Sequence, residues 1–129
     1  MLVKKSIGII DSQDALIGNK AYDLASLVDD VRLKTSESLK KKMFNFYLSK
    51  NKKINKKKFK NDFEILSVLR NLKIIGIFTR LAIRDGKIKY LKLIPYAWKL
   101  ISIRINKNKV FKNLNDLLNQ NFKKELNAN

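Results

Sequence analysis

The sequence contains no cysteine and no histidine among its 129 residues. Without cysteine, the chain forms no disulfide bond, holds no metal through thiolates and offers no cysteine nucleophile. Without histidine, it has no histidine-based zinc site, no histidine general base and no Ser-His-Asp triad. Any catalysis or metal binding by this chain must therefore rely on Asp, Glu, Lys, Arg or Tyr side chains.

Long apolar runs are missing as well. No run of roughly 18 apolar residues occurs, so the sequence predicts no membrane-spanning helix. Lys4 and Lys5 follow the first residues too soon for a signal peptide. We therefore expect a cytoplasmic protein without a membrane partner. Apolar residues still make up 45% of the chain, which is enough for a packed core in one domain or in part of a larger one.

Positive charge dominates the composition, with a formal net charge of +18. Such a surface attracts phosphate groups of nucleic acid, nucleotides or anionic lipid. However, lysines outnumber arginines by 24 to five, whereas nucleic-acid recognition favours the planar fork of arginine. Because Lys, Asn and Ile are abundant together, as AT-rich codons produce, we interpret the charge as a background property. A basic helical module that binds nucleic acid is the alternative.

Apolar periodicity predicts a mainly α-helical chain behind one short strand. The strand covers residues 6–11, and helices are expected over residues 21–31, 39–47, 59–83, 95–105 and 111–122. The segment Thr35-Ser36-Glu37-Ser38 offers a cap for the second helix, and Asn55 is an expected cap for the third. Asp85-Gly86 is an expected helix stop and Pro95 part of a first helical turn. A single strand needs a partner, so either residues 1–5 complete a hairpin or the partner strands lie outside this sequence.

The predicted second and third helices differ in how far they are buried. In the second, Leu39, Met43, Phe46 and Tyr47 should face the core, and the lysines of residues 40–42 should lie on the other side. The third is apolar nearly all round over residues 72–83, which predicts a central helix packed between others. Gly76 within it indicates a close contact or a bend, since glycine there costs about 1 kcal/mol relative to alanine. In the first helix, Asp29, Asp30 and Arg32 should lie away from the buried stripe or at its edge.

Two acidic residues follow the predicted strand. Asp11 ends the apolar run of residues 7–10, and Asp14 comes three residues later. A carboxylate held where the chain leaves a sheet is well placed to bind a hard cation such as Mg²⁺. The alternative is an ordinary strand followed by a polar turn. Asp23 lies in the first turn of the next helix, where the helix dipole alone favours an acid.

Two blocks of sequence together resemble a known family. The first runs Gly8-Ile9-Ile10-Asp11, Gln13-Asp14-Ala15, Gly18 and Tyr22-Asp23-Leu24-Ala25-Ser26-Leu27; the second covers residues 72–81, Arg84-Asp85-Gly86-Lys87 and Tyr90-Leu91. These residues resemble the second half of the aminoglycoside/choline-kinase-like phosphotransferases. Within that family they are most similar to the bacterial kinases that phosphorylate the anomeric hydroxyl of N-acetylmuramate and N-acetylglucosamine. The resemblance covers about residues 6–105.

The resemblance implies the helical C-terminal lobe of a protein-kinase-like fold, with a short N-terminal strand or hairpin. Residues 1–129 would form this partial lobe, with the metal-loop strand and turn in residues 1–19 and a helical bundle in residues 20–126. The implied whole enzyme transfers the phosphate of ATP to a sugar hydroxyl, using Mg²⁺. Asp11 matches the Mg²⁺ ligand and Asp23 a residue that supports the catalytic loop. The candidates on the substrate side are Asp14, Asp30, Arg80, Arg84 and Asp85, with an ion pair among the last four as the alternative.

Two departures from the family limit what this chain does alone. Ser12 stands where these kinases carry Phe. The His-x-Asp-x-x-x-x-Asn catalytic loop, which supplies the general base, is absent from the sequence together with the ATP-binding lobe. We therefore expect the isolated chain to be inactive and to need a separate N-terminal kinase lobe as partner. A non-catalytic remnant of such a kinase is a further alternative.

Overall fold

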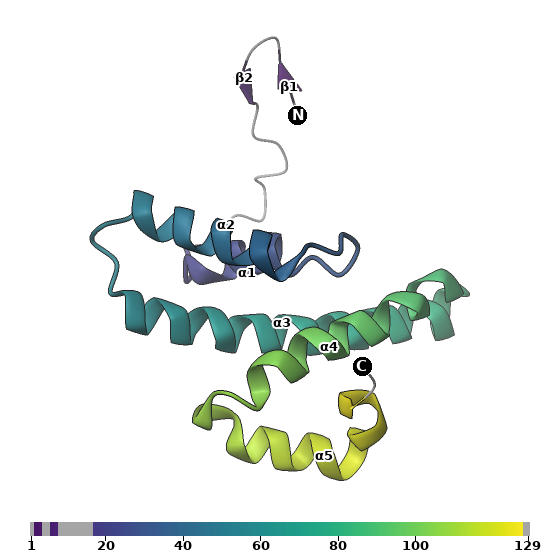
Figure 1. Cartoon of the computed structure of the whole chain (residues 1–129). Coiled ribbons are helices and arrows are strands. Elements are labelled where there is room, and N and C mark those ends of the chain that lie inside the picture. Colours follow the sequence, from purple (N-terminus) through teal and green to yellow (C-terminus); the bar gives the residue numbers. More distant parts are fainter. Residues whose placement is uncertain (1, 4–5, 8–16, 128–129) are drawn as a thin grey trace.

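The computed structural model describes residues 2–3, 6–7 and 17–127. This part of the chain is mainly helical, as the periodicity predicts (Figure 1). Its elements are β1 (Leu2–Val3), β2 (Ser6–Ile7), α1 (Ala21–Val28), α2 (Glu37–Lys50), α3 (Lys56–Asp85), the 3₁₀ helix η1 (Ile88–Leu93), α4 (Ile94–Ile105), the 3₁₀ helix η2 (Lys109–Phe111) and α5 (Lys112–Asn127). Each of the five predicted helices is therefore confirmed.

The two strands form a hairpin. They are antiparallel, with Leu2 opposite Ile7 and Val3 opposite Ser6. Of the two alternatives, the hairpin completed by residues 1–5 is therefore the one observed. The rest of the predicted strand, through Asp11, lies outside the described residues, and so do Gln13 and Asp14.

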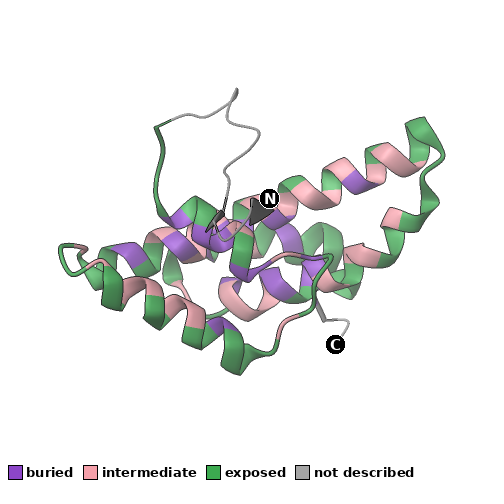
Figure 2. Cartoon of the chain, turned by 90° about the horizontal axis from the view of Figure 1, so that it is seen from above, coloured by how far each residue is buried: buried purple, intermediate pink, exposed green. Residues whose placement is uncertain are grey.

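Helix α3 is the central element. In Figure 1, α1 and α2 lie above α3, α4 crosses it, and α5 lies below. The side facing α1 and α2 is filled largely by aromatic rings, with Phe44 5.0 Å from Phe63 and Tyr47 stacked 5.3 Å from Phe59. The opposite side is filled around Trp98 and Ile101 of α4. The buried positions accordingly recur along the faces that the helices turn toward one another (Figure 2).

The predicted helix boundaries have the expected chemistry. The side-chain oxygen of Asn55 accepts a hydrogen bond from the Lys58 amide at 3.0 Å and caps α3. At its other end, Gly86 adopts a left-handed conformation with φ of 63°, which glycine accepts without a Cβ clash. Pro95 lies in the first turn of α4, where its missing N–H costs nothing.

The prediction that α3 is packed on all sides over residues 72–83 is wrong in part. Ile83 is 82% exposed, so one stripe of α3 remains at the surface. The predicted close contact at Gly76 is also wrong, because a Cβ built there meets no atom within 4 Å. The alternative, a bend at Gly76, stays a prediction.

Gly76 within α3 and Gly86 directly after it are expected to change stability in opposite directions when replaced by alanine. Gly76→Ala should raise the free energy of unfolding by about 1 kcal/mol, because alanine has the higher helix propensity and open space receives its methyl group. Gly86→Ala should lower it by about 1 kcal/mol or more, because alanine is strained at positive φ. Urea unfolding followed by circular dichroism measures both. Equal changes in the two variants would contradict this assignment of the helix end.

Helix α2 is rotated relative to the prediction. Leu39 and Phe46 are 46% and 65% exposed, whereas Lys40, predicted on the outer side, is buried. The residues that face the core are Lys40, Met43, Phe44, Tyr47 and Leu48. Two contacts explain this rotation: the ring of Phe44 packs against α3, and Lys40 meets a buried carboxylate.

Candidate functional site

A buried carboxylate joins four helices. Asp29 directly follows α1, and its backbone N–H still donates to the Ala25 carbonyl at 3.0 Å. Its side chain is fully buried, which corrects the prediction that it lies away from the buried stripe or at its edge. Ser67 of α3 donates a hydrogen bond to Asp29 Oδ2 at 2.6 Å, and Arg104 Nη2 of α4 lies 2.6 Å from the same oxygen. Lys40 Nζ of α2 reaches Oδ1 at 3.3 Å.

These residues, together with Arg70, form what we call the Asp29 cluster. Arg70 Nη1 donates to the Asp29 backbone carbonyl at 3.2 Å, so α3 holds this residue at two points. Burial acts to lower the pKa of Lys40. The Asp29 carboxylate, Tyr96 and Glu37 outweigh it and leave that pKa above its ordinary value. Lys40 therefore stays charged at neutral pH, and two cations, the buried Lys40 and the largely buried Arg104, contact the one buried carboxylate.

The Asp29 cluster is suited to support rather than to chemistry. Both oxygens of the carboxylate are engaged by partners, and no surface of Asp29 is open to a substrate. A proton acceptor in catalysis must reach the proton it removes. We therefore assign the cluster to holding the end of α1 in place, beside a groove that begins at the next residue.

A groove of about 370 Å³ opens at that point. It is lined by Asp30, Val31, Arg32, Arg70, Ile74, Phe78, Leu81 and Tyr90, and we call it the Asp30 groove. The residues come from the loop after α1, from α3 and from η1. The groove thus combines one carboxylate and two guanidinium groups with the paired rings of Phe78 and Tyr90, whose centroids lie 5.1 Å apart.

Asp30 is held in one orientation by Arg32. The guanidinium donates two hydrogen bonds to the carboxylate, at 3.0 Å from Nε and 2.7 Å from Nη2, and the Arg32 amide adds a third at 2.9 Å. The hydrogen bond from the Arg32 side chain is the main cause that holds the pKa of Asp30 below its usual value, and the charge of Arg70 adds to it. Asp30 is therefore ionised at neutral pH and can accept hydrogen bonds from hydroxyl groups.

The other predicted site residues lie elsewhere. Asp23 is exposed in the first turn of α1, which confirms its predicted position at the positive end of the helix dipole. Arg80, Arg84 and Asp85 lie in the last two turns of α3, and none of them lines the Asp30 groove. Arg84 and Asp85 pair with each other at 2.6 Å, and this contact lowers the pKa of Asp85. The predicted ion-pair alternative therefore holds for these two residues.

The predicted metal ligand Asp11 and its neighbour Asp14 lie outside the described residues. Within the part that the structure does describe, no three acidic side chains come close enough together to hold a metal ion. The Mg²⁺ site stays a prediction from the sequence.

Sequence reasoning missed Lys40, Ser67, Arg70, Arg104 and Tyr90 as site residues. One signal was present for Lys40, because residues 40, 44, 47 and 48 share one face of a helix at the usual three- and four-residue spacing. Tyr90 belongs to the second block of the resemblance, and for Ser67, Arg70 and Arg104 the sequence holds no local signal. Their roles depend on contacts between helices that are far apart along the chain.

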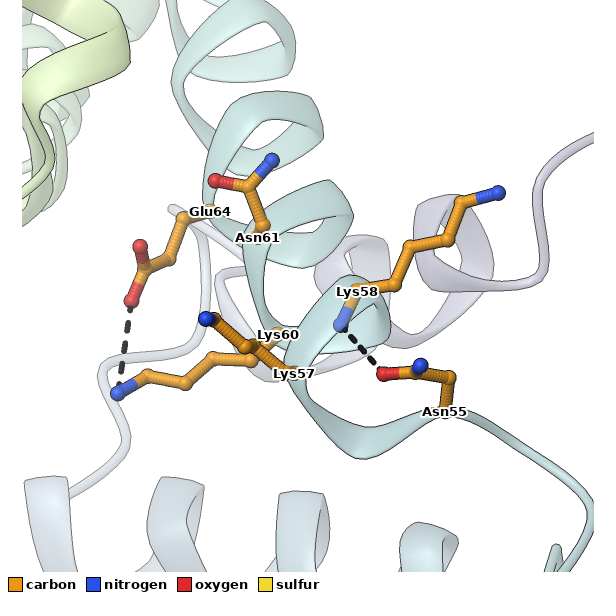
Figure 3. A pocket seen from close by; sticks show the side chains of 6 residues that line it. All are labelled: Asn55, Lys57, Lys58, Lys60, Asn61 and Glu64. Carbon is orange, nitrogen blue, oxygen red and sulfur yellow. Dashed lines mark hydrogen bonds and ion pairs between the residues drawn. The ribbon is translucent and has the colours of Figure 1, made fainter.

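None of the helices in the described residues is long and apolar enough to cross a membrane. A second surface hollow, in Figure 3, is formed by the cap and the first turns of α3 alone, from Asn55 to Glu64. Because no other element closes it, we do not assign it as a binding site for a small molecule.

Comparison with known proteins places the chain beside one class of enzyme, the bacterial amino-sugar kinases. A protein from Caulobacter vibrioides is 32% identical over 97 residues, covering 75% of this chain and 27% of the relative. One from Neisseria meningitidis is 38% identical over 101 residues, covering 74% and 30%. One from Pseudomonas aeruginosa is 30% identical over 124 residues, covering 92% and 37%.

All three relatives are named N-acetylmuramate/N-acetylglucosamine kinase, so the resemblance noted from the sequence is confirmed. This chain spans between about a quarter and two fifths of their length. No protein-family profile matches the chain, and no solved structure matches it.

Proposed function

We propose that this chain is the C-terminal lobe of an ATP-dependent kinase that phosphorylates an amino sugar, as in cell-wall recycling. The observation that carries the proposal is the similarity to kinases that all bear the same name, over most of this chain. Because the chain spans only part of each relative, the ATP-binding lobe and the catalytic loop with its general base must come from a further segment. Residues 1–19 would supply the metal-binding loop and residues 20–126 the helical bundle.

Asp11 is the proposed ligand of Mg²⁺. A carboxylate, with a second one at Asp14, fits the oxygen-donor chemistry of this cation, which commonly uses one or two carboxylates plus phosphate oxygens. When bound, Mg²⁺ neutralises charge on the nucleotide phosphates. Asp23 is proposed to support the catalytic loop, and its exposure at the start of α1 leaves the carboxylate accessible to another segment.

The Asp30 groove is the proposed sugar-side surface. The Asp30 carboxylate and the Arg70 guanidinium offer acceptors and donors to sugar hydroxyls, and the rings of Phe78 and Tyr90 offer an apolar face. Such a combination of a few fixed polar groups with aromatic walls is typical of small-molecule sites. Among the substrate-side candidates in the described part, Asp30 is the one that this surface supports.

Asp30→Asn and Asp85→Asn form a matched pair that tests this surface. Both aspartate side chains are 24% exposed and both are paired with an arginine, but only Asp30 lines the groove. In the assembled enzyme, we expect Asp30→Asn to raise the KM for the sugar about tenfold, because the sugar loses about one hydrogen bond to a charged group. The KM for ATP should stay unchanged. Asp85→Asn should change neither. A larger effect on the sugar in Asp85→Asn would move the sugar site to the end of α3.

The proposed function is tested by assembling the whole enzyme. In the Caulobacter vibrioides relative, the portion that matches this chain is replaced by this chain, and ATP-dependent phosphorylation is measured for N-acetylmuramate, N-acetylglucosamine and glucose. We expect turnover with at least one of the two amino sugars, little with glucose and none from the 129-residue chain alone. A folded chimera that phosphorylates neither amino sugar, while the parent relative does, would reject the proposal.

A further inference from the structure

The positive charge of this protein is concentrated in one hairpin. Residues 38–61, which comprise most of α2, the connecting loop and the start of α3, carry ten lysines and not one Asp, Glu or Arg. This segment therefore holds +10 of the net +18 in fewer than a fifth of the residues. Residues 86–115 also lack acids, but their eight cations are spread over 30 residues, whereas residues 38–61 hold ten cations in 24 residues. We call residues 38–61 the basic hairpin.

Nine of these ten lysines point to solvent. Lys40 is the exception, since it is buried against Asp29; the others are exposed. Figure 3 shows Lys57, Lys58 and Lys60 extending from the start of α3, where Lys60 reaches Glu64 at 4.0 Å. At the loop, Lys20, Lys50, Lys52 and Lys53 surround a hollow of about 610 Å³ together with Ile54. The basic hairpin thus presents nine exposed lysines, three of which lie at the end of α2 and in the loop around this hollow.

Large apolar side chains lie within this field. Leu39, Lys42, Phe46 and Lys50 follow one another at three- and four-residue spacing, so they form one outward stripe of α2. Leu39 is 46% and Phe46 65% exposed, and the Lys50 ammonium lies 5.5 Å from the Phe46 ring centroid. An outward stripe that alternates lysine with leucine and phenylalanine is typical of helices that lie in a membrane interface.

These features favour a lipid surface over nucleic acid. A DNA duplex makes use of the lysines, but it offers nothing to Leu39 or to Phe46, and its readers favour arginine. An anionic bilayer uses both kinds of side chain, because lysine stems extend to the headgroups while the apolar groups enter the interface. We propose that the basic hairpin docks on the surface of an anionic membrane, with the outward stripe of α2 against the bilayer. The proposal departs from the expectation that the chain has no membrane partner, because that expectation rested on the lack of a spanning helix and did not consider a surface contact. It does not depend on the kinase assignment.

The test is co-sedimentation of the 129-residue chain with vesicles of phosphatidylglycerol and phosphatidylcholine in equal parts, compared with phosphatidylcholine alone. We expect binding to the first and little to the second. Each lysine near an anionic bilayer contributes about a fivefold gain, so the triple variant Lys42→Gln, Lys50→Gln and Lys53→Gln should bind about a hundredfold more weakly. The control triple variant Lys99→Gln, Lys107→Gln and Lys112→Gln has the same net charge and should bind like the unaltered chain.

A second pair of variants separates the bilayer from other polyanions. Phe46→Ser should weaken vesicle binding about tenfold, and Leu117→Ser, at a residue of α5 that is 55% exposed, should not. Circular dichroism verifies that all variants keep their helices. Equal losses in the two lysine triples would overturn the proposal. So would tighter binding to a DNA duplex than to anionic vesicles without any effect of Phe46→Ser, which would identify a nucleic-acid surface instead.

Discussion

Asp29→Asn is expected to lower the free energy of unfolding by about 3–5 kcal/mol, the largest loss of stability among the substitutions considered. Removing one partner of a buried ion pair leaves the other charge without compensation in a medium of low polarity. Here two cations, Lys40 and Arg104, lose the same carboxylate, and Ser67 loses its acceptor. The next residue supplies the control: Asp30→Asn is the same chemical change in a partly exposed pair and should cost at most about 1 kcal/mol. Urea unfolding measures both.

The charge balance of the Asp29 cluster adds a second expectation. Lys40→Met removes one of the two cations that contact the Asp29 carboxylate and leaves the pair with Arg104, so its cost should be smaller than that of Asp29→Asn. The raised pKa of Lys40 determines the pH range in which this residue stabilises the fold. The contribution of Lys40 is complete below its pKa in the unfolded chain, about 10.4, and is lost as the pH rises through its higher pKa in the folded chain. Equal stability of Asp29→Asn and Asp30→Asn at pH 7 would show that the cluster does not hold the helices together.

The helices were predictable from the sequence, but the sides of α2 and α3 that face their neighbours were not. Helix positions depend on local periodicity and on caps such as Asn55 and Gly86, all of which are read within a few residues. The facing of α2 was predicted from its apolar residues alone, and Lys40 was placed outside because a lysine is rarely buried. The structure buries it because a carboxylate from another helix neutralises it.

The candidate site was predictable only in part for the same reason. Asp30 was named as a substrate-side candidate because the resemblance implied it, and it does line a groove. Arg70 and Tyr90, which line the same groove, lie 40 and 60 residues away in the sequence, and no spacing rule connects them to Asp30. Asp29 was predicted to lie away from the buried stripe or at its edge, because the apolar residues of the first helix define that stripe without it. Asp29 is buried and Asp30 is partly exposed, because Arg104 of α4 pairs with the Asp29 carboxylate.

Asp11→Asn is expected to reduce turnover by the assembled chimera at least about a thousandfold. A metal ion stabilises charge in the transition state by several kcal/mol, and each 1.36 kcal/mol corresponds to a tenfold change in rate. Asparagine keeps the size of the side chain and an oxygen donor but removes the negative charge. The loss should therefore appear in kcat and in the dependence on Mg²⁺ concentration, and the KM for the sugar should stay unchanged.

The control for Asp11 is Asp116→Asn, the same change at an exposed position of α5, where turnover should vary by less than about twofold. Circular dichroism must show that Asp11→Asn keeps its helices, so that a loss of turnover is not a loss of folding. Full turnover by Asp11→Asn in an active chimera would reject Asp11 as the metal ligand while leaving the kinase assignment intact. An inactive chimera that carries the unaltered chain would reject the assignment itself, so the two hypotheses fail separately.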